Sequence, residues 1–329
     1  MPAADVLLVS LGSTPGLRAS DFEFAGMLRR AGANVVVATA RAPREVRTFA
    51  LTDLAWAWSA REAARRGIAE VSPRAVVYST VTAALFWPRP GAIRYDAPAA
   101  ANRPGRHGLW QRPLERRRLA QASLLVPVDG GTIAETPEPH APALVVPIPV
   151  QASAGADAAG DRDIAVMTYA ANPHKKGLDR VLAAWAAARR DGEELVVAGA
   201  DLRIDEPGVR VAGRLEPADY RALLRRARVF VAAPRREDYG IAQLEALADG
   251  CVLVTTTAPG PYAALPFARA LDPRLVVADD ADLPSALRTA LDDPIVGYAR
   301  HATAAIAPFS RDAIDAIVRE QLLPRLLGT

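Results

Sequence analysis

Residues 233–250 read APRREDYGIAQLEALADG, and the apolar run Val252–Thr255 follows them. Another apolar run, Val229–Ala232, comes directly before. The pattern predicts a buried strand, a loop, a helix over Ile241–Ala248 and a second strand. Gly240 permits a tight turn at the helix start. A strand–helix–strand unit of this kind indicates a parallel sheet in an α/β protein.

The same alternation continues along the whole chain. Further strands are predicted at Val6–Val9, Val35–Ala38, Val76–Tyr78, Leu124–Val126, Leu144–Val146, Ile164–Thr168, Leu195–Ala198 and Val209–Ala212. Further helices are predicted at Asp21–Ala31, Asp53–Arg66, Leu109–Gln121, Leu178–Arg190, Ala218–Arg226 and Asp312–Leu327. This order of elements is typical of doubly wound α/β domains.

Residues 151–162 are small or polar and show no periodicity, which predicts a linker. We therefore expect a Rossmann-like domain over 1–150, a second one over 163–308, and a C-terminal helix over 309–329 that packs back on the first. Ligands of open α/β sheets bind beyond the carboxyl ends of the strands. Two such domains that face each other would form a cleft for two substrates.

Composition narrows the class of protein. Half of the 329 residues are hydrophobic, and the one cysteine, Cys251, excludes an intrachain disulfide and suits a reducing compartment. The N-terminal residues lack the features of a signal peptide, and no stretch approaches the ~20 apolar residues of a membrane span. We expect a cytoplasmic protein with no nucleic-acid partner.

The charges are unevenly distributed. Residues 1–155 carry a net charge of +6 and residues 156–329 one of −3. The basic half suits an acidic acceptor or an anionic membrane, or is simply a solvated surface. The chain has 38 arginines but only two lysines, the adjacent Lys175 and Lys176. Because an ammonium is a compact point charge, the pair suggests a phosphate site, with chance clustering as the alternative.

The helix that begins at Ile241 offers a second anion site. Its first backbone amides have no partner within the helix and can bind a diphosphate. Glu245 lies about one turn further on, on an apolar helix where a buried carboxylate needs hydrogen-bond donors such as ribose hydroxyls. Glu237, in the preceding loop, would reach a transferred sugar. The alternatives are that Glu245 pairs with an arginine on the surface and that Glu237 lies in solvent.

The spacing of Glu237 and Glu245, followed by Ala-Leu-Ala-x-Gly and a hydrophobic strand, resembles the signature of the family 4 retaining glycosyltransferases, which have the GT-B fold. The resemblance implies that Glu237 contacts the donor sugar and that Glu245 binds the nucleotide ribose. Lys176-Gly177-Leu178-Asp179 resembles the Lys-Gly-x-Asp of this family, in which the lysine holds the donor diphosphate.

The segment around Lys176 departs from the family pattern in one respect. Ala170 and Ala171 stand where the family usually has an arginine. The second positive charge for the diphosphate must then come from elsewhere, and the local candidates are Lys175, His174, Arg235 and Arg236. The resulting donor-binding set comprises Lys175, Lys176, Gly177, Gly240, Ile241 and Glu245.

The resemblance also implies the reaction. We expect transfer of a sugar from a nucleotide diphosphosugar to an acceptor hydroxyl of unknown identity, with retention and without a metal or other cofactor. Asp96 follows Ile93-Arg-Tyr95 where the family often has His-Asp, so it is the candidate for orienting the acceptor. Asp280-Ala-Asp282 spells a metal-binding D-x-D, but Asp282 directly precedes a predicted helix and is better interpreted as its N-cap.

The first half of the chain contains one predicted helix that is a candidate for binding to a membrane surface. Trp110 and Leu114 share the predicted helix Leu109–Gln121 with several arginines. Either these apolar residues pack into the core of their own domain, or the helix lies peripherally on an anionic membrane.

Two other functions stay open. One is a catalytically degenerate GT-B protein that only binds a ligand, because a fold alone does not establish activity. The other is a different nucleotide-dependent α/β enzyme, although Leu11–Gly16 is not the dinucleotide-binding G-x-G-x-x-G.

Overall fold

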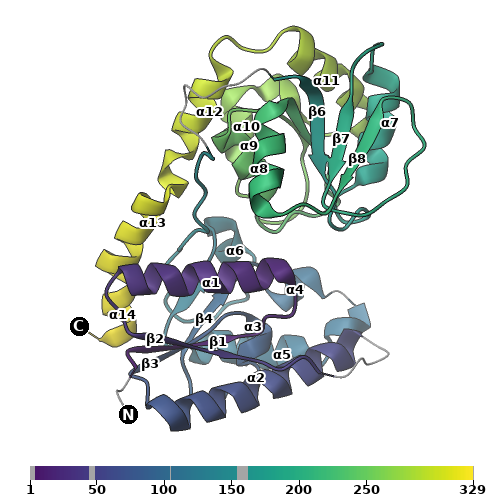
Figure 1. The fold of residues 1–329 in the computed structure, drawn as a ribbon. Helices are drawn as coiled ribbons and strands as arrows, with labels where there is room; N and C mark the ends of the chain where they lie inside the picture. Colours follow the sequence, from purple (N-terminus) through teal and green to yellow (C-terminus); the bar gives the residue numbers. More distant parts are fainter. Residues whose placement is uncertain (1–3, 44–48, 104, 154–161, 329) are drawn as a thin grey trace. The chain divides into compact units, whose positions relative to one another are not determined.

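The computed structural model describes residues 4–43, 49–103, 105–153 and 162–328. The chain forms two compact units, Met1–Pro149 with Arg311–Thr329, and Val150–Ser310 (Figure 1). Each unit is built on one parallel sheet, so the predicted α/β class with two Rossmann-like domains is confirmed. Most of the predicted linker, residues 154–161, lies outside the described residues.

The first unit holds a five-stranded sheet in the order β2-β1-β3-β4-β5. Its strands are β1 (Val6–Ser10), β2 (Val35–Thr39), β3 (Ala75–Tyr78), β4 (Ala92–Tyr95) and β5 (Leu125–Pro127). Its helices are α1 (Pro15–Arg30), α2 (Phe49–Val71), α3 (Val81–Ala84), α4 (Ala99–Asn102), η1 (Gly105–Gly108), α5 (Gln111–Gln121) and α6 (Gly130–Ala134). All described strand pairs are parallel, and the order is that of flavodoxin-like domains.

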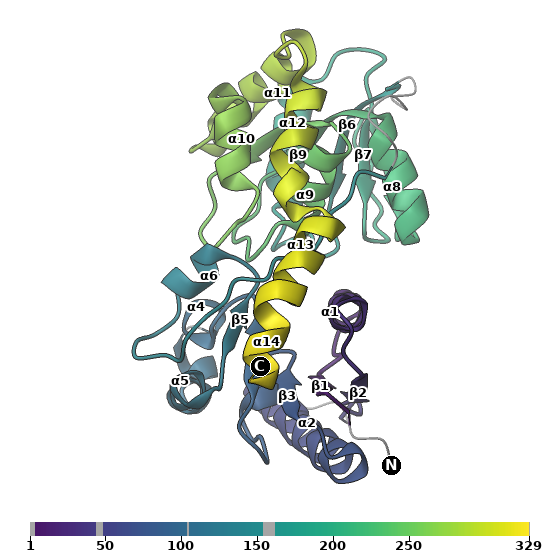
Figure 2. The ribbon, with the colours of Figure 1, turned by 90° about the vertical axis from the view of Figure 1, so that its left-hand side faces the viewer.

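Alternate residues of β1 point to opposite faces of this sheet and enter two separate cores. Leu7 and Val9 pack with residues of α2 and α5, whereas Val6 and Leu8 pack with residues of α1. The second core also receives Ile314, Val318 and Leu322 from the C-terminal segment. That segment consists of α13 (Arg311–Ile317), a π-helical turn, η5 (Val318–Leu322), and α14 (Leu323–Leu327), and Figure 2 shows it along the sheet of the first unit.

The predicted strand Leu144–Val146 is wrong. The segment runs beside β5, with hydrogen bonds from Leu144 N–H to Leu125 O (2.9 Å) and from Val146 N–H to Pro127 O (3.0 Å). Only an isolated bridge, between Leu125 and Ala143, forms there. Prolines at 142, 147 and 149 have no N–H to donate, so a regular ladder cannot continue.

The second unit holds a six-stranded sheet in the order β11-β10-β9-β6-β7-β8. Its strands are β6 (Ile164–Tyr169), β7 (Leu195–Ala198), β8 (Val209–Gly213), β9 (Ala227–Ala232), β10 (Val252–Thr256) and β11 (Val276–Val277). Its helices are α7 (Leu178–Ala188), α8 (Pro217–Arg226), α9 (Ile241–Ala248), α10 (Leu265–Leu271), η2 (Pro273–Leu275), η3 (Asp280–Asp282), α11 (Leu283–Asp292), α12 (Tyr298–Ile306) and η4 (Ala307–Phe309). This is the Rossmann strand order, and the direction of winding reverses between β6 and β9.

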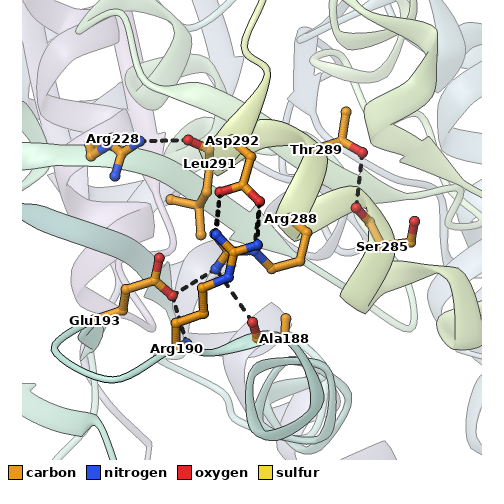
Figure 3. A network of polar contacts seen from close by, with 9 residues as sticks. All are labelled: Ala188, Arg190, Glu193, Arg228, Ser285, Arg288, Thr289, Leu291 and Asp292. Carbon is orange, nitrogen blue, oxygen red and sulfur yellow. Dashed lines mark hydrogen bonds and ion pairs between the residues drawn. The ribbon is translucent and has the colours of Figure 1, made fainter.

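A polar network fixes helix α11 to the turn between α7 and β7 (Figure 3). Arg288 contacts Glu193 at 2.7 Å and Asp292 at 2.5 Å, and Arg190 also contacts Asp292 at 2.8 Å. Glu193 precedes β7, so this network lies at the amino end of that strand. It stabilises the unit at the end of β7 opposite to that where a ligand of a Rossmann sheet binds.

No helix within the described residues is both long enough and apolar enough to cross a membrane.

Candidate active site

Two loops meet at the point where the winding of the second sheet reverses. One follows β6 and carries Lys175-Lys176-Gly177, and the other follows β9 and begins at Ala233. Arg235 N–H donates to Lys175 O at 3.0 Å. A Cβ atom at Gly177, whose φ is +64°, would lie 1.9 Å from Ala233 O. Only glycine allows this approach, and it places the two lysines beside the second loop.

Each lysine pairs with a carboxylate of the opposite loop. Lys176 Nζ lies 2.6 Å from Glu237 Oε2, and Lys175 Nζ lies 2.6 Å from Asp238 Oδ2. Glu237 is only 4% exposed, so the alternative of a solvated loop carboxylate is wrong. Lys176 and Glu237, which lie 61 residues apart in the sequence, thus form one partly buried ion pair.

The loop after β10 fixes the backbone of Glu237. Glu237 N–H donates to Pro259 O (3.0 Å), and Tyr262 N–H donates to Glu237 O (3.3 Å). A Cβ atom at Gly260 would lie 2.2 Å from Glu237 O, so this loop can pack closely only with glycine there. The loop after β10 therefore holds the backbone of Glu237, while Lys176, from the loop after β6, contacts its side chain.

Helix α9 begins beside this ion pair. Gly240 stands at its N-cap with φ +86°, and no side chain caps the helix. The sequence predicts an anion site at such a helix start. A small pocket lies here, lined by Tyr169, Lys176, Phe230, Ala232, Pro234, Ala242 and Gln243.

Glu245 lies on α9 and pairs with an arginine that sequence reasoning missed. Arg221 Nη1 from α8 lies 3.2 Å from Glu245 Oε1, and Arg221 Nε lies 2.8 Å from Asp249 Oδ2. Burial raises the pKa of Glu245 above its ordinary value, while Arg221 acts in the opposite direction. The expected arginine pairing of Glu245 therefore exists, but the carboxylate is largely buried rather than on an open surface. Arg221 could not be selected from sequence because nothing local distinguishes it from the other arginines of α8.

The candidates for the second phosphate charge differ in their surroundings. Arg235 makes a bidentate ion pair with Asp179 (2.9 and 2.7 Å), which directs it towards the start of α7. Arg236 contacts Asp238 at 2.7 Å, and Lys175 contacts the other oxygen of that carboxylate. Lys175 and Arg236 thus lie together beside the Lys176–Glu237 pair.

Asp96 lies in the first unit, directly after β4, and is exposed. Its carbonyl oxygen accepts a hydrogen bond from Thr132 Oγ1 (2.8 Å). The preceding Tyr95, which stands at the histidine position of the resembled family, is buried, with its hydroxyl 2.9 Å from Thr136 Oγ1. Burial raises the pKa of Tyr95 to about 12. Tyr95 is therefore a core residue, and the role of Asp96 stays a prediction.

The D-x-D sequence has structural contacts. Asp280 pairs with Arg180 at 3.1 Å, and Asp279 rather than Asp282 accepts a capping hydrogen bond, from Ala281 N–H (3.0 Å). Asp282 occupies the N-cap position of α11 but makes no side-chain cap there, so its predicted capping role is wrong. The described residues hold no group of three or more His, Cys, Asp or Glu side chains placed to hold a metal.

The arginine-rich helix α5 packs against its own unit. Trp110 and Leu114 contact the core between the sheet and α2, and Leu119 is fully buried in it. Arg118 Nε donates to Leu85 O at 2.9 Å. These contacts agree with the core-packing interpretation of this helix.

Comparison with known proteins agrees with this architecture. Residues 163–293 match the family model described as Glycosyl transferases group 1. Sucrose-phosphate synthase from Thermosynechococcus elongatus superposes with a TM-score of 0.75 and 15% identity, over 98% of each chain. WaaG, a glycosyltransferase involved in lipopolysaccharide biosynthesis, gives 0.74 and 16%, over 98% of this chain and 100% of WaaG.

A trehalose 6-phosphate synthase from Burkholderia multivorans gives a TM-score of 0.66 and 13% identity, over 100% of this chain and 99% of the synthase. A search of curated protein sequences gave no significant match. The chain has the GT-B fold of these glycosyltransferases. The match to the group 1 glycosyl transferase family model falls within its second unit.

Proposed function

We propose that the protein is a glycosyltransferase that moves a sugar from a nucleotide diphosphosugar to an acceptor hydroxyl. The observation that carries this proposal is the contact between Lys176 and Glu237, at the start of α9, in a group 1 glycosyl transferase domain. A cation, a helix N-terminus and a carboxylate at one place match what a diphosphosugar presents, which is a dianion joined to a hydroxylated ring.

In this proposal, Lys175, Lys176 and the amides from Ile241 onward hold the diphosphate, and Gly177 and Gly240 allow the backbone to approach it. These fixed positive groups stabilise the departing diphosphate without a metal or cofactor. Glu245 binds the ribose, Glu237 the transferred sugar, and Asp96 orients the acceptor hydroxyl. We propose retention of the anomeric configuration, which rests on the resemblance to the family 4 enzymes.

Two variants test the assignment of the carboxylates. Removal of a hydrogen bond between a charged group and a ligand costs about 1.5–3 kcal/mol, or roughly 10- to 150-fold in affinity or rate. Glu245→Ala should weaken binding of the nucleoside diphosphate, whereas Glu237→Ala should chiefly lower the rate of donor turnover. Equal effects of both variants on nucleotide affinity would contradict the assigned roles. Tight donor binding without any transfer or donor hydrolysis would favour the alternative of a binding protein.

We propose a cytoplasmic location and an acceptor that reaches the basic first unit. Co-sedimentation with vesicles that contain anionic lipid, at low and at high salt, tests the membrane alternative. Salt-sensitive binding to the vesicles would favour a lipid-linked acceptor, because salt screens attraction to anionic headgroups. Protein that stays in the supernatant at low salt would favour a soluble acceptor.

A further inference from the structure

A glutamine on the buried side of α9 reaches the carboxylate of Glu237. Gln243 is 2% exposed, and its Nε2 donates to Glu237 Oε2 at 3.1 Å. Lys176 Nζ contacts the same oxygen at 2.6 Å. Within the described part of the chain, Glu237 Oε1 makes no hydrogen bond, so both contacts fall on one oxygen and leave the other for a ligand.

Gln243 is a polar residue at a buried position of an otherwise apolar helix face. The neighbouring residues of α9 that are buried are apolar, namely Ala242, Leu244, Ala246 and Leu247. A buried amide costs free energy unless it forms hydrogen bonds. Among the described residues, Gln243 Oε1 has no hydrogen bond of good geometry, and the Gln243 side chain lies beside the buried hydroxyl of Tyr262. The same side chain lines the pocket beside Lys176. Gln243 thus contributes polar atoms both to the contact with Glu237 and to the lining of this pocket.

The two partners of Glu237 differ in what they do when a donor arrives. A diphosphate attracts Lys176 away from Glu237, because a phosphate dianion carries more charge than a carboxylate. If Gln243 were absent, Glu237 would then be a buried carboxylate without a donor, which is strongly unfavourable. Gln243 is neutral, belongs to a helix and gains nothing from the diphosphate, so its hydrogen bond persists.

We infer that Gln243 is a positioning residue, which holds Glu237 Oε2 while Lys176 binds the diphosphate and so keeps Glu237 Oε1 directed at the donor sugar. The inference rests on the proposed donor site. It assigns to Gln243 no direct share in binding the nucleotide, and its effect on the sugar passes through Glu237.

The test compares Gln243→Glu and Gln243→Leu with the wild type. Leu fills a similar volume without polar atoms and so removes the donor. Glu has the shape of Gln, but in its ionised form it has no donor and repels the carboxylate of Glu237. The exposed Gln321 provides a matched control, Gln321→Leu, far from α9 in the sequence and in the other unit. Thermal melting of each variant shows whether it folds.

We expect both Gln243 variants to lower kcat with the nucleotide sugar by about 10- to 150-fold, the range for a hydrogen bond to a charged group. Their Kd for the nucleoside diphosphate alone should stay within about threefold of the wild type. In a Glu237→Ala background, Gln243→Leu should lower kcat no further, because a residue that acts through another shows this non-additivity.

Two results would overturn the inference. One is a folded Gln243→Leu variant with wild-type kcat, and the other is a full additional loss in the double variant. A wild-type protein that binds no nucleoside diphosphate would instead contradict the donor site itself, so the two failures can be told apart.

Discussion

The guanidinium of Arg221 lies 3.2 Å from the carboxylate of Glu245, and this contact joins two helices of the second unit. Arg221 also donates to Gln151 O at 2.7 Å, while Asp249, its second carboxylate partner, accepts hydrogen bonds from Ser153. The proposed ribose-binding carboxylate is therefore part of a network that also holds the first residues of the second unit.

This contact predicts how nucleotide binding depends on pH. Burial raises the pKa of Glu245, and Arg221 partly offsets the effect. If the ribose needs the ionised form, affinity falls as pH decreases through a value above the ordinary one for a glutamate. Arg221→Leu removes the offsetting cation, so the loss should occur at higher pH than in the wild type.

Calorimetry with a nucleoside diphosphate over a pH series measures this shift. The diphosphate itself titrates, so Glu245→Gln, which cannot ionise, is the reference for the ligand's own contribution. Superimposable pH profiles of the wild type and Glu245→Gln would remove Glu245 from the ribose site.

Gly177 offers a test of the contact between the two loops. Gly177→Ala would place Cβ 1.9 Å from Ala233 O, whereas at Gly192, with φ +83°, a Cβ atom meets nothing within 4 Å. Both substitutions carry the strain of a left-handed residue, about 1 kcal/mol. Only Gly177→Ala should also abolish binding of the nucleoside diphosphate. Thermal melting of both variants measures the strain, and calorimetry measures whether displacement of the lysines weakens binding. Equal affinity of the two variants for the nucleoside diphosphate would contradict the role of the loop contact.

The proposed means of charge stabilisation predicts that turnover survives EDTA. Lys175, Lys176 and the start of α9 supply the positive charge for the diphosphate, so a chelator should change kcat by less than about twofold. The measurement is donor turnover with and without excess EDTA. Complete loss of activity, restored by Mn²⁺ or Mg²⁺, would show that a metal takes part.

Many of the helices and strands could be predicted from sequence, because apolar periodicity and glycine positions mark their bounds locally. The bounds of α9 and β7 agree with those predicted, since β7 is an apolar run followed by Gly199 and α9 lies between Gly240 and Gly250. Helix α10 and strand β11 were not predicted. Strand β11 has only two residues, and its pairing with β10 depends on the rest of the sheet.

In the candidate site, too, the residues in local motifs could be predicted from sequence, but the contacts between distant segments could not. Lys176, Glu237 and Glu245 lie in recognisable local motifs, so each could be named from sequence. Their partners could not be, because Arg221 and Glu245 come from different helices and meet only through the packing of α8 on α9. Gln243 lay inside the motif, but a helical period alone does not show which residue it contacts.

The first unit contains a buried acid whose behaviour can be tested separately. Asp21 is 3% exposed, and burial raises its pKa from 3.8 to about 6, although Ser10, Ser79 and Arg94 act in the opposite direction. The folded state then binds this proton more tightly than the unfolded state. Protonation of Asp21 therefore stabilises the folded state. This contribution to the free energy of unfolding, ~3 kcal/mol at most, is fully present below pH 3.8 and is lost as pH rises through about 6.

Asp21→Asn should remove that pH dependence. The variant, which has no buried charge, should gain stability relative to the wild type at neutral pH, and the difference should shrink as the pH falls towards 4. Its side-chain oxygen can still accept the hydrogen bond from Ser10 Oγ, which is 2.5 Å long in the wild type. Denaturant unfolding at several pH values measures the difference, and a constant offset across the series would contradict the prediction.

Calorimetric titration with UDP, GDP and ADP tests the donor site most directly. The comparison is between the wild type, Lys176→Ala and Arg288→Ala, the last of which disrupts the network at the amino end of β7. The wild type should bind at least one of the three diphosphates, and Lys176→Ala should lose at least tenfold in affinity. Arg288→Ala should melt at a lower temperature yet bind like the wild type. Binding that is unchanged in Lys176→Ala, or absent in the wild type for all three, would contradict the proposed donor site.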